Sequence, residues 1–231
     1  MNTVSIWRQL RRLPVTYSLI TINVLTYCGQ LIRPVTTDEF STLRRGLMRD
    51  GIVYIYDGRD YPGYTEVGID AGEWYRMITG AFLHSPPDSG LGPAHLVMNM
   101  VWIWLLGRVM ELELGRIRFV MLYLGSAIGG GLMEYALAPE ASAIGASGAV
   151  YGLMGAYFVL SLRDPQLRRD ARTLLIVGVV WLVLSAQLTS WQGHLGGLLA
   201  GCVIGALCLW PLGSRRPAPG TDLPSWHPDR L

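Results

Sequence analysis

The chain has 231 residues, of which 51% are hydrophobic and only 16% are charged, and its net charge is +2. Soluble domains carry about 25% charged residues, so this composition indicates a membrane protein. With a charge so close to neutral and no basic stripe of interleaved aromatic residues, nucleic acid is not an expected partner. Cys28, Cys202 and Cys208 all lie in apolar runs, which predicts neither a disulfide framework nor a metal-binding motif.

Six apolar runs are long enough to cross a bilayer, which takes about 20 residues of helix. They cover residues 15–32, 94–111, 116–137, 144–162, 172–190 and 191–212. Because backbone groups cannot stay unpaired in lipid, we expect an all-α polytopic membrane protein, a six-helix bundle that forms one domain over residues 15–212. Residues 1–14 are the expected cytoplasmic N-terminus, and the proline-rich segment 213–231 is expected to be a disordered cytoplasmic tail.

The arginines predict the orientation, because loops rich in basic residues stay on the cytoplasmic side. All 19 basic residues are arginines, and 13 of them fall in segments that are cytoplasmic if the N-terminus is inside. The other six lie in the first loop, residues 33–93, which is long enough to be translocated whatever its charge. We therefore expect both termini inside, in a multi-pass protein of a bacterial plasma membrane.

The first loop is the only long connection, and we expect it on the outer side. Its first half is polar with aromatic interruptions and can hold short helices or a hairpin. Its second half, GEWYRMITGAFLH, is amphipathic and too short to span the membrane. We expect it to lie in the membrane interface, with Trp74, Tyr75 and Phe82 against lipid and Arg76 reaching headgroups or nearby carbonyls.

Each predicted helix that enters from the outer side begins with polar residues. The second carries His95 and Asn99, the fourth carries Ser147, and the sixth carries His194. Polar groups inside a membrane are costly and usually face a partner or a water-filled cavity. Their matched depth on three helices predicts one shared cavity that opens to the outer face.

Small residues that recur every four positions predict which of these helices touch. They are Gly148, Gly152 and Ala156 on the fourth run, and Gly193, Gly197, Gly201 and Gly205 on the sixth. Such stripes let helix backbones approach closely. Packing the two stripes together brings Ser147 near His194, which is the arrangement of a serine nucleophile and its histidine base.

Other residues near this pair can support the chemistry. His95 and Asn99 lie four residues apart on one helical face, so both can donate hydrogen bonds to the negative oxygen of a tetrahedral intermediate, together with the Ser147 backbone N–H. Gly145 permits a tight turn that leaves N–H groups free near the serine. The ring of Tyr151, one turn beyond Ser147, can stack on the histidine.

A carboxylate that would complete a catalytic triad is not evident. Glu111 lies at the inner end of its helix, too far from the serine. Glu134 lies near the outer end of the third helix, and the sequence leaves its role open. We expect a Ser–His dyad that needs no metal and no cofactor.

The motifs GEWYRMITGAFLH, HLVMN, ELELG, GASGAVYGLMG and GHLGGLLAG follow one another along the chain. In this order they resemble the rhomboid family of intramembrane serine proteases, over about residues 72–205 and the first helix. The resemblance implies that Ser147 is the nucleophile, that His194 is the general base, and that His95 and Asn99 stabilise the oxyanion. The family cleaves transmembrane protein substrates within or just outside the membrane, so substrates and membrane lipids are the expected partners. The reaction takes place in a water-filled cavity and uses no cofactor.

The resemblance also gives roles to residues outside this group. It implies that the Tyr151 ring stacks on the base and that Tyr75-Arg76 is the first-loop aromatic–arginine pair. Glu111 matches a structural carboxylate from which no chemistry is expected. The chain departs from the family pattern where Gly193 precedes His194, since alanine is commoner there. The segment HSPPDSGLGPAH is also longer than the family pattern, and the role of its His84 stays open.

Other interpretations use the same residues. His95 and His194 could ligate a haem or a metal, but the GASG motif would then be unexplained. A transporter or channel would use the polar cavity as a path, but the sequence has no inverted repeat. The absence of an HExxH motif argues against a zinc protease. The main alternative is a catalytically silent rhomboid-like protein that binds membrane proteins, because a fold alone does not confer activity.

Overall fold

The structure is a computed structural model that describes residues 12–59, 61–138, 142–184 and 189–209. Six long helices dominate it. They are α2 (Pro14–Ile32), α5 (Pro93–Leu114), α6 (Arg116–Leu137), α7 (Ser147–Arg163), α8 (Arg168–Leu184) and α9 (Trp191–Leu209). Each overlaps one predicted run. The last residues of the sixth run, part of the fifth and the expected tail lie outside the described residues.

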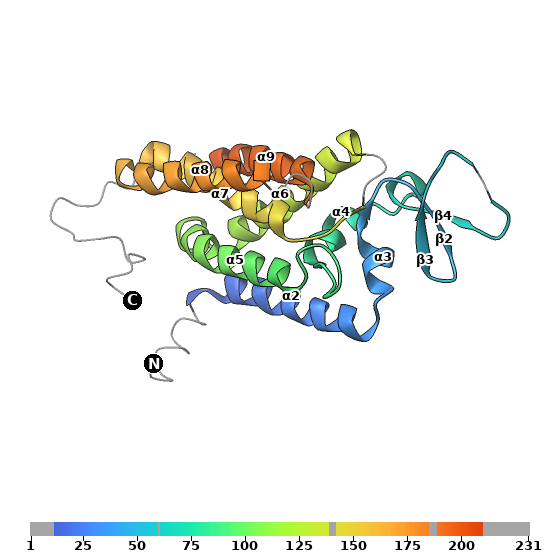
Figure 1. The fold of residues 1–231 in the computed structure, drawn as a ribbon. Helices are drawn as coiled ribbons and strands as arrows, with labels where there is room; N and C mark the ends of the chain where they lie inside the picture. Colours follow the sequence, from blue (N-terminus) through green and yellow to red (C-terminus); the bar gives the residue numbers. More distant parts are fainter. Residues whose placement is uncertain (1–11, 60, 139–141, 185–188, 210–231) are drawn as a thin grey trace.

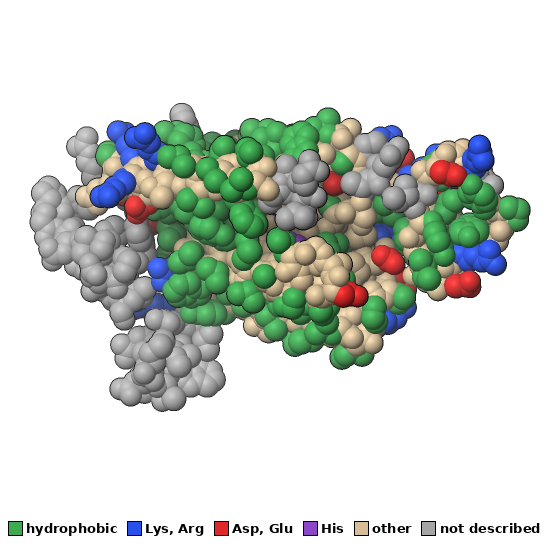
Figure 2. Space-filling model, viewed as in Figure 1, with side chains coloured by type: hydrophobic (Ala, Val, Ile, Leu, Met, Phe, Trp, Pro, Cys, Tyr) green, Lys and Arg blue, Asp and Glu red, His purple; other side chains and the backbone are tan. Residues whose placement is uncertain are grey.

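Three described helices, α2, α6 and α9, are long and apolar enough to cross a membrane. Helix α5 has 22 residues, but the polar side chains of His95, Asn99 and Arg108 lower its hydropathy. Helices α7 and α8 have 17 residues each. Figure 2 shows hydrophobic side chains over most of the visible face of the bundle, with charged side chains gathered toward its ends.

Helix α7 is the central helix of the bundle. It contacts α5, α6, α8 and α9, and in Figure 1 α2 and α5 lie on one side of it while α8 and α9 lie on the other. Eleven of its 17 residues are buried. A helix that is apolar on all sides is expected in such a position. The residue that begins α7 is Ser147, so the proposed nucleophile starts the best-packed helix.

Glu111 joins the beginning of α2 to the far end of α5. Its carboxylate accepts hydrogen bonds from the backbone N–H of Val15 (3.0 Å) and of Thr16 (2.8 Å), and from the Thr16 hydroxyl (2.7 Å). The first N–H groups of a helix have no partner within the helix, and a negative charge is favourable there. Glu111 therefore caps α2 from a neighbouring helix. It lies at the opposite end of α5 from His95, as predicted.

The first loop adds β-structure, so the expectation of an all-α chain is wrong in this part. Strands β2 (Gly46–Arg49), β3 (Ile52–Ile55) and β4 (Thr65–Val67) form an antiparallel sheet in the order β3-β2-β4, at one end of the molecule in Figure 1. Asp50 and Gly51 join β2 to β3 with φ of 53° and 80°. An Asp-Gly turn with positive φ at both residues matches the twist of a hairpin, so the predicted hairpin option is correct.

A second pair of strands links the first loop to the segment that precedes Ser147. Strand β1 (Thr42–Leu43) follows α3 (Thr36–Phe40) and pairs antiparallel with β5 (Ser142–Ala143). Two residues later, the backbone N–H of Gly145 donates to the carbonyl of Gly80, 2.9 Å away. The turn that leads into α7 is thus held on both sides by the first loop.

The amphipathic segment forms only α4 (Arg76–Thr79) and one 3-10 turn, η2 (Gly80–Phe82). Trp74 and Tyr75 are exposed, as expected for residues at a membrane interface, with 57% and 46% of their surface accessible. Phe82 differs from the prediction, because it is partly buried and its ring lies 6.2 Å from that of Tyr123. The helical backbone continues through Gly80 and ends at Leu83, whose backbone is extended.

Candidate active site

Ser147 and His194 meet at the heads of α7 and α9. Ser147 Oγ lies 2.8 Å from His194 Nε2, and the histidine is only 2% exposed. Ser147 is the first residue of α7 and its N–H belongs to the first turn, whose N–H groups have no partner within the helix. A hydroxyl, an imidazole nitrogen and free N–H groups therefore converge at one point.

The glycine stripes explain why the two heads meet. A Cβ placed on Gly197 or on Gly201 would lie within 3.0 Å of the backbone of Gly148 or Gly152. Such a Cβ has no room, because the obstacle in each case is backbone rather than a flexible side chain. The predicted contact between α7 and α9 is therefore confirmed, and it sets the register that brings Ser147 opposite His194.

The Tyr151 ring stacks on the His194 imidazole, with ring centroids 4.5 Å apart and planes 11° apart. Its hydroxyl donates to the Gly178 carbonyl of α8 at 2.7 Å, which fixes the ring. The other imidazole nitrogen, His194 Nδ1, is buried and has no hydrogen-bond partner among the described residues. Stacking thus orients the ring on one side, and no described carboxylate holds it on the other.

Glu134 is buried near the dyad, and the unpartnered Nδ1 of His194 forms no hydrogen bond with it. It accepts a hydrogen bond from the hydroxyl of Ser190, the residue before α9. The same hydroxyl accepts from the Gly193 N–H at 2.9 Å, so Ser190 caps α9. Ser190 was not among the predicted site residues, although a serine immediately before an apolar run is a common signal for a helix start.

His95 is held by a contact that determines its tautomer. The Ser85 backbone N–H lies 3.2 Å from His95 Nδ1 and can only donate, so Nδ1 accepts and the neutral ring carries its proton on Nε2. The Ser85 hydroxyl lies at the same distance. A Cβ on Gly145, whose φ is +123°, would lie 2.7 Å from His95 Nε2, so this position requires glycine. Ser85 gave no signal in the sequence.

Asn99 lies one turn after His95 and donates to the His95 carbonyl at 2.8 Å through one of its two amide hydrogens. It lines a cavity of about 210 Å³ together with His95, Ser147, Tyr151 and His194. The rest of the lining is mostly apolar and comes from α5, α7 and α8, including Met98, Trp102, Met154 and Trp181. The structure thus brings the predicted polar residues of three helices to one cavity.

His84, whose role the sequence left open, lies behind His95. It is fully buried, its Nε2 lies 3.0 Å from Asn23 Oδ1, and Gln30 contacts its backbone N–H and carbonyl. Burial, together with the neighbouring His95, lowers the pKa of His84 to about 3, so the ring is neutral. Its partners on α2 indicate that His84 anchors the loop to that helix.

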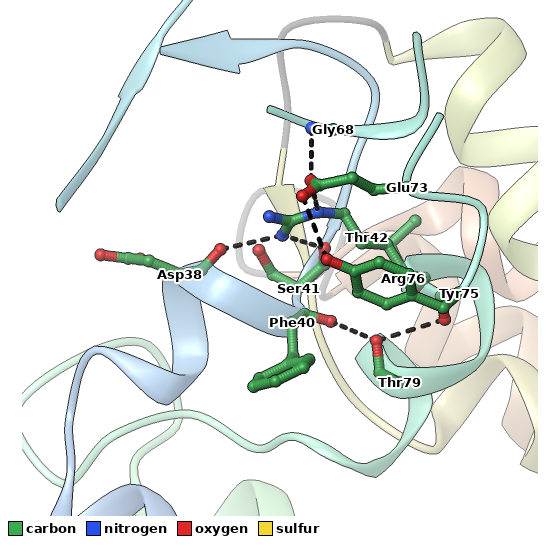
Figure 3. Close-up of polar contacts among 9 residues, drawn as sticks. All are labelled: Asp38, Phe40, Ser41, Thr42, Gly68, Glu73, Tyr75, Arg76 and Thr79. Atoms are coloured by element: carbon green, nitrogen blue, oxygen red, sulfur yellow. Dashed lines mark hydrogen bonds and ion pairs between the residues drawn. The ribbon is translucent and has the colours of Figure 1, made fainter. Parts of the chain in front are cut away.

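Arg76 is fully buried and does not line the cavity. Figure 3 shows its polar contacts. Its guanidinium donates to the Glu73 carboxylate at 2.6 Å and to the carbonyls of Asp38 and Ser41 at 2.9 and 3.1 Å. The prediction that Arg76 reaches nearby carbonyls is confirmed, whereas its burial leaves it no access to lipid headgroups. The neighbouring Tyr75 is exposed.

Comparison with known proteins identifies the family. Residues 71–211 match the model of the rhomboid domain. The chain is 34% identical to YdcA of Bacillus subtilis over 152 residues, which are 64% of this chain and 73% of YdcA. It is 34% identical to the rhomboid protease GluP of Bacillus subtilis over 137 residues, which are 58% of this chain but only 26% of GluP. It is 29% identical to the rhomboid protease GlpG of Haemophilus influenzae over 163 residues, which are 68% of this chain and 78% of GlpG. The chain therefore belongs to the rhomboid family, whose members GluP and GlpG are named as proteases.

Proposed function

We propose that this chain is an intramembrane serine endopeptidase that cleaves transmembrane protein substrates. The observation that carries the proposal is the distance of 2.8 Å between Ser147 Oγ and His194 Nε2. A neutral imidazole at this distance can take the hydroxyl proton as the oxygen attacks, which is how a weak nucleophile is activated. The mostly apolar cavity beside the pair suits a segment of a substrate helix.

In the first step, Ser147 Oγ attacks the carbonyl carbon of the scissile peptide bond and its proton passes to His194 Nε2. The tetrahedral intermediate then collapses, the C–N bond breaks, and His194 returns the proton to the leaving amine. Water, deprotonated by the same nitrogen, hydrolyses the acyl ester and restores Ser147. The cycle needs no cofactor.

The negative oxygen of each tetrahedral intermediate requires donors that are already in place. We assign this role to the Ser147 N–H at the beginning of α7, to Nε2–H of His95 and to the free amide hydrogen of Asn99. The partial positive charge of the helix N-terminus favours the same oxygen. Gly145 supports the assignment, because its missing side chain leaves space beside His95 Nε2.

The orientation follows from the charge distribution. We propose that all six long helices cross the membrane, with both termini in the cytoplasm and the first loop outside, because basic residues mark cytoplasmic loops. The heads of α7 and α9, and with them the dyad, then lie toward the outer face. A substrate helix must partly unwind to present its carbonyl, since helical carbonyls are already hydrogen-bonded.

The test uses the full chain in detergent with a fluorophosphonate probe and a transmembrane substrate. We expect the wild type to be labelled and to cleave the substrate, and Ser147→Ala to do neither. His194→Ala is expected to lose both reactions while it keeps the Ser147 hydroxyl. A folded wild type that neither reacts with the probe nor cleaves would contradict the proposal and favour the catalytically silent alternative.

A further inference from the structure

Within the part of the chain that the structure describes, no hydrogen bond holds Nδ1 of His194, the proposed base. In serine proteases with a triad, a buried carboxylate orients the imidazole through Nδ1. Here His194 Nδ1 has no partner among the described residues, and the ring is held by stacking on Tyr151. The position of the imidazole therefore depends on the backbone at the head of α9.

That backbone is packed against two other helices. The Gly193 carbonyl lies 2.8 Å from the position that a Cβ on Gly130 of α6 would take, and 3.3 Å from the corresponding position on Gly148 of α7. These glycines leave room for the head of α9 but supply no polar contact to hold it there. One turn beyond Gly130, on the same face of α6, is Glu134, which is only 3% exposed.

Glu134 reaches the head of α9 through Ser190. The Ser190 hydroxyl donates to the Glu134 carboxylate and accepts from the Gly193 N–H, and the Ser190 carbonyl accepts from the His194 N–H at 3.2 Å. We propose that Glu134 and Ser190 act as a positioning pair that fixes the head of α9 and thereby the His194 imidazole. A carboxylate near a helix N-terminus is also favoured by the helix dipole. The inference rests on the proposed function, because the residue it positions is the proposed general base.

The missing side chain of Gly193 independently supports the role of Glu134 and Ser190. A Cβ at that position would lie 3.0 Å from Ser190 Oγ and 3.5 Å from Glu134 Oε2. The first of these distances is tighter than ordinary van der Waals contact, so an alanine side chain would press on the shared hydroxyl. The glycine that departs from the family pattern thus fits the space that the pair needs.

The first measurement is the rate at which a fluorophosphonate labels Ser147, together with kcat and KM for a transmembrane substrate. We expect Ser190→Ala to lower the labelling rate and kcat by about 10- to 100-fold, because a small misplacement of a catalytic group has an effect of this size. KM should stay within about twofold, since substrate contacts are unchanged. Ser190→Thr retains the hydroxyl and should recover most of the rate. Ser161→Ala, which removes only a bond to the Phe158 carbonyl, is the matched control.

The partners should also be coupled. Glu134→Ala is expected to match Ser190→Ala, and the double variant should be no slower than either single one, because both remove the same interaction. Gly193→Ala should lower the labelling rate of Ser147 when it is introduced into the wild type, but it should have little effect on that rate when Ser190 is already alanine. Wild-type labelling rates per folded molecule in Ser190→Ala and Glu134→Ala would overturn the proposal.

Nitrogen resonances of a 15N-labelled His194 give a readout that does not depend on activity. We expect Ser190→Ala to shift the Nε2 resonance, because the contact with Ser147 changes, and Ser190→Thr to restore it. Unchanged resonances in Ser190→Ala would overturn the positioning role, even if the fluorophosphonate probe never reacts with Ser147. A wild type without labelling would instead contradict the proposed function, so the two failures are distinguishable.

Discussion

At the residue scale, the candidate site contains two histidines with different surroundings. The Ser85 N–H fixes the tautomer of His95, which can then act only as a donor toward the cavity. His194 faces a hydroxyl and is free to accept its proton. In the proposed mechanism, the different hydrogen-bond partners of His95 and His194 suit one for oxyanion stabilisation and the other for base catalysis.

Asn99 tests the oxyanion assignment. We expect Asn99→Ala to lower kcat by about 10²-fold, because removing one oxyanion-hole donor from a known serine protease has a cost of at least this size. The midpoint of thermal unfolding should change little, since the lost bond to the His95 carbonyl is local to α5. Steady-state cleavage and thermal unfolding of the same samples measure both. Full activity of the folded variant would remove Asn99 from this role.

Individual residues were predictable where their partners follow from helix spacing. Ser147, His194 and Tyr151 lie beside the glycine stripes of two predicted helices, so their proximity could be predicted from the spacing of these residues alone. Ser85 and Ser190 act from loops, where the position of a side chain depends on tertiary structure rather than on a period. Glu134 lay between these cases, because its place on α6 was evident but its partner was not.

At the element scale, the contact between α7 and α9 determines the geometry of the dyad. Gly201→Ala should destabilise the protein by about 1–3 kcal/mol, because the new Cβ meets the backbone of Gly152 within 3.0 Å. It should also slow labelling of Ser147 by separating the helix heads. The matched control is Gly29→Ala, because a Cβ at Gly29 of α2 meets nothing within 4 Å. Thermal unfolding and labelling rates check both variants, and equal behaviour would contradict this account.

Elements in the first loop were less predictable than the long helices. The hairpin had a local signal, since the Asp50-Gly51 dipeptide favours a two-residue hairpin turn and the strand-forming run Ile52–Ile55 follows it. The amphipathic segment was predicted to place Phe82 against lipid, and its sequence contains no signal for the packing of that ring against Tyr123 of α6. The β1–β5 pairing joins segments about 100 residues apart and has no local signal.

At the scale of the whole molecule, buried polar contacts join the first loop to the helices. Arg76 begins α4, and its guanidinium holds Glu73 and the end of α3 in one cluster (Figure 3). From there β1 reaches β5 and the turn before Ser147. The loop therefore braces the turn that leads to Ser147, although it lies outside the Ser147–His194 pair.

The Glu73–Arg76 pair makes this bracing depend on pH. Burial raises the pKa of Glu73, but hydrogen bonds from the Gly68 N–H and from Arg76 outweigh it and leave the pKa below its usual range. A carboxylate with a depressed folded-state pKa contributes stability above its unfolded value, about 4.3, and this contribution is lost as the pH falls through the lower folded value.

We therefore expect Glu73→Gln to lower the free energy of unfolding by about 2 kcal/mol at pH 7, the size of a lost hydrogen bond to a charged group. The difference from the wild type should shrink as the pH falls from about 4.3, where Glu73 of the unfolded chain takes up a proton, toward the lower folded-state pKa, where the folded carboxylate is protonated too. Glu66→Gln is the control, because Glu66 and its partner Arg45 are both more than a third exposed and such pairs contribute little. Thermal unfolding across this pH range measures both variants. A Glu73→Gln deficit that persists at low pH would show that shape, rather than the charge of Glu73, holds the first loop to the bundle.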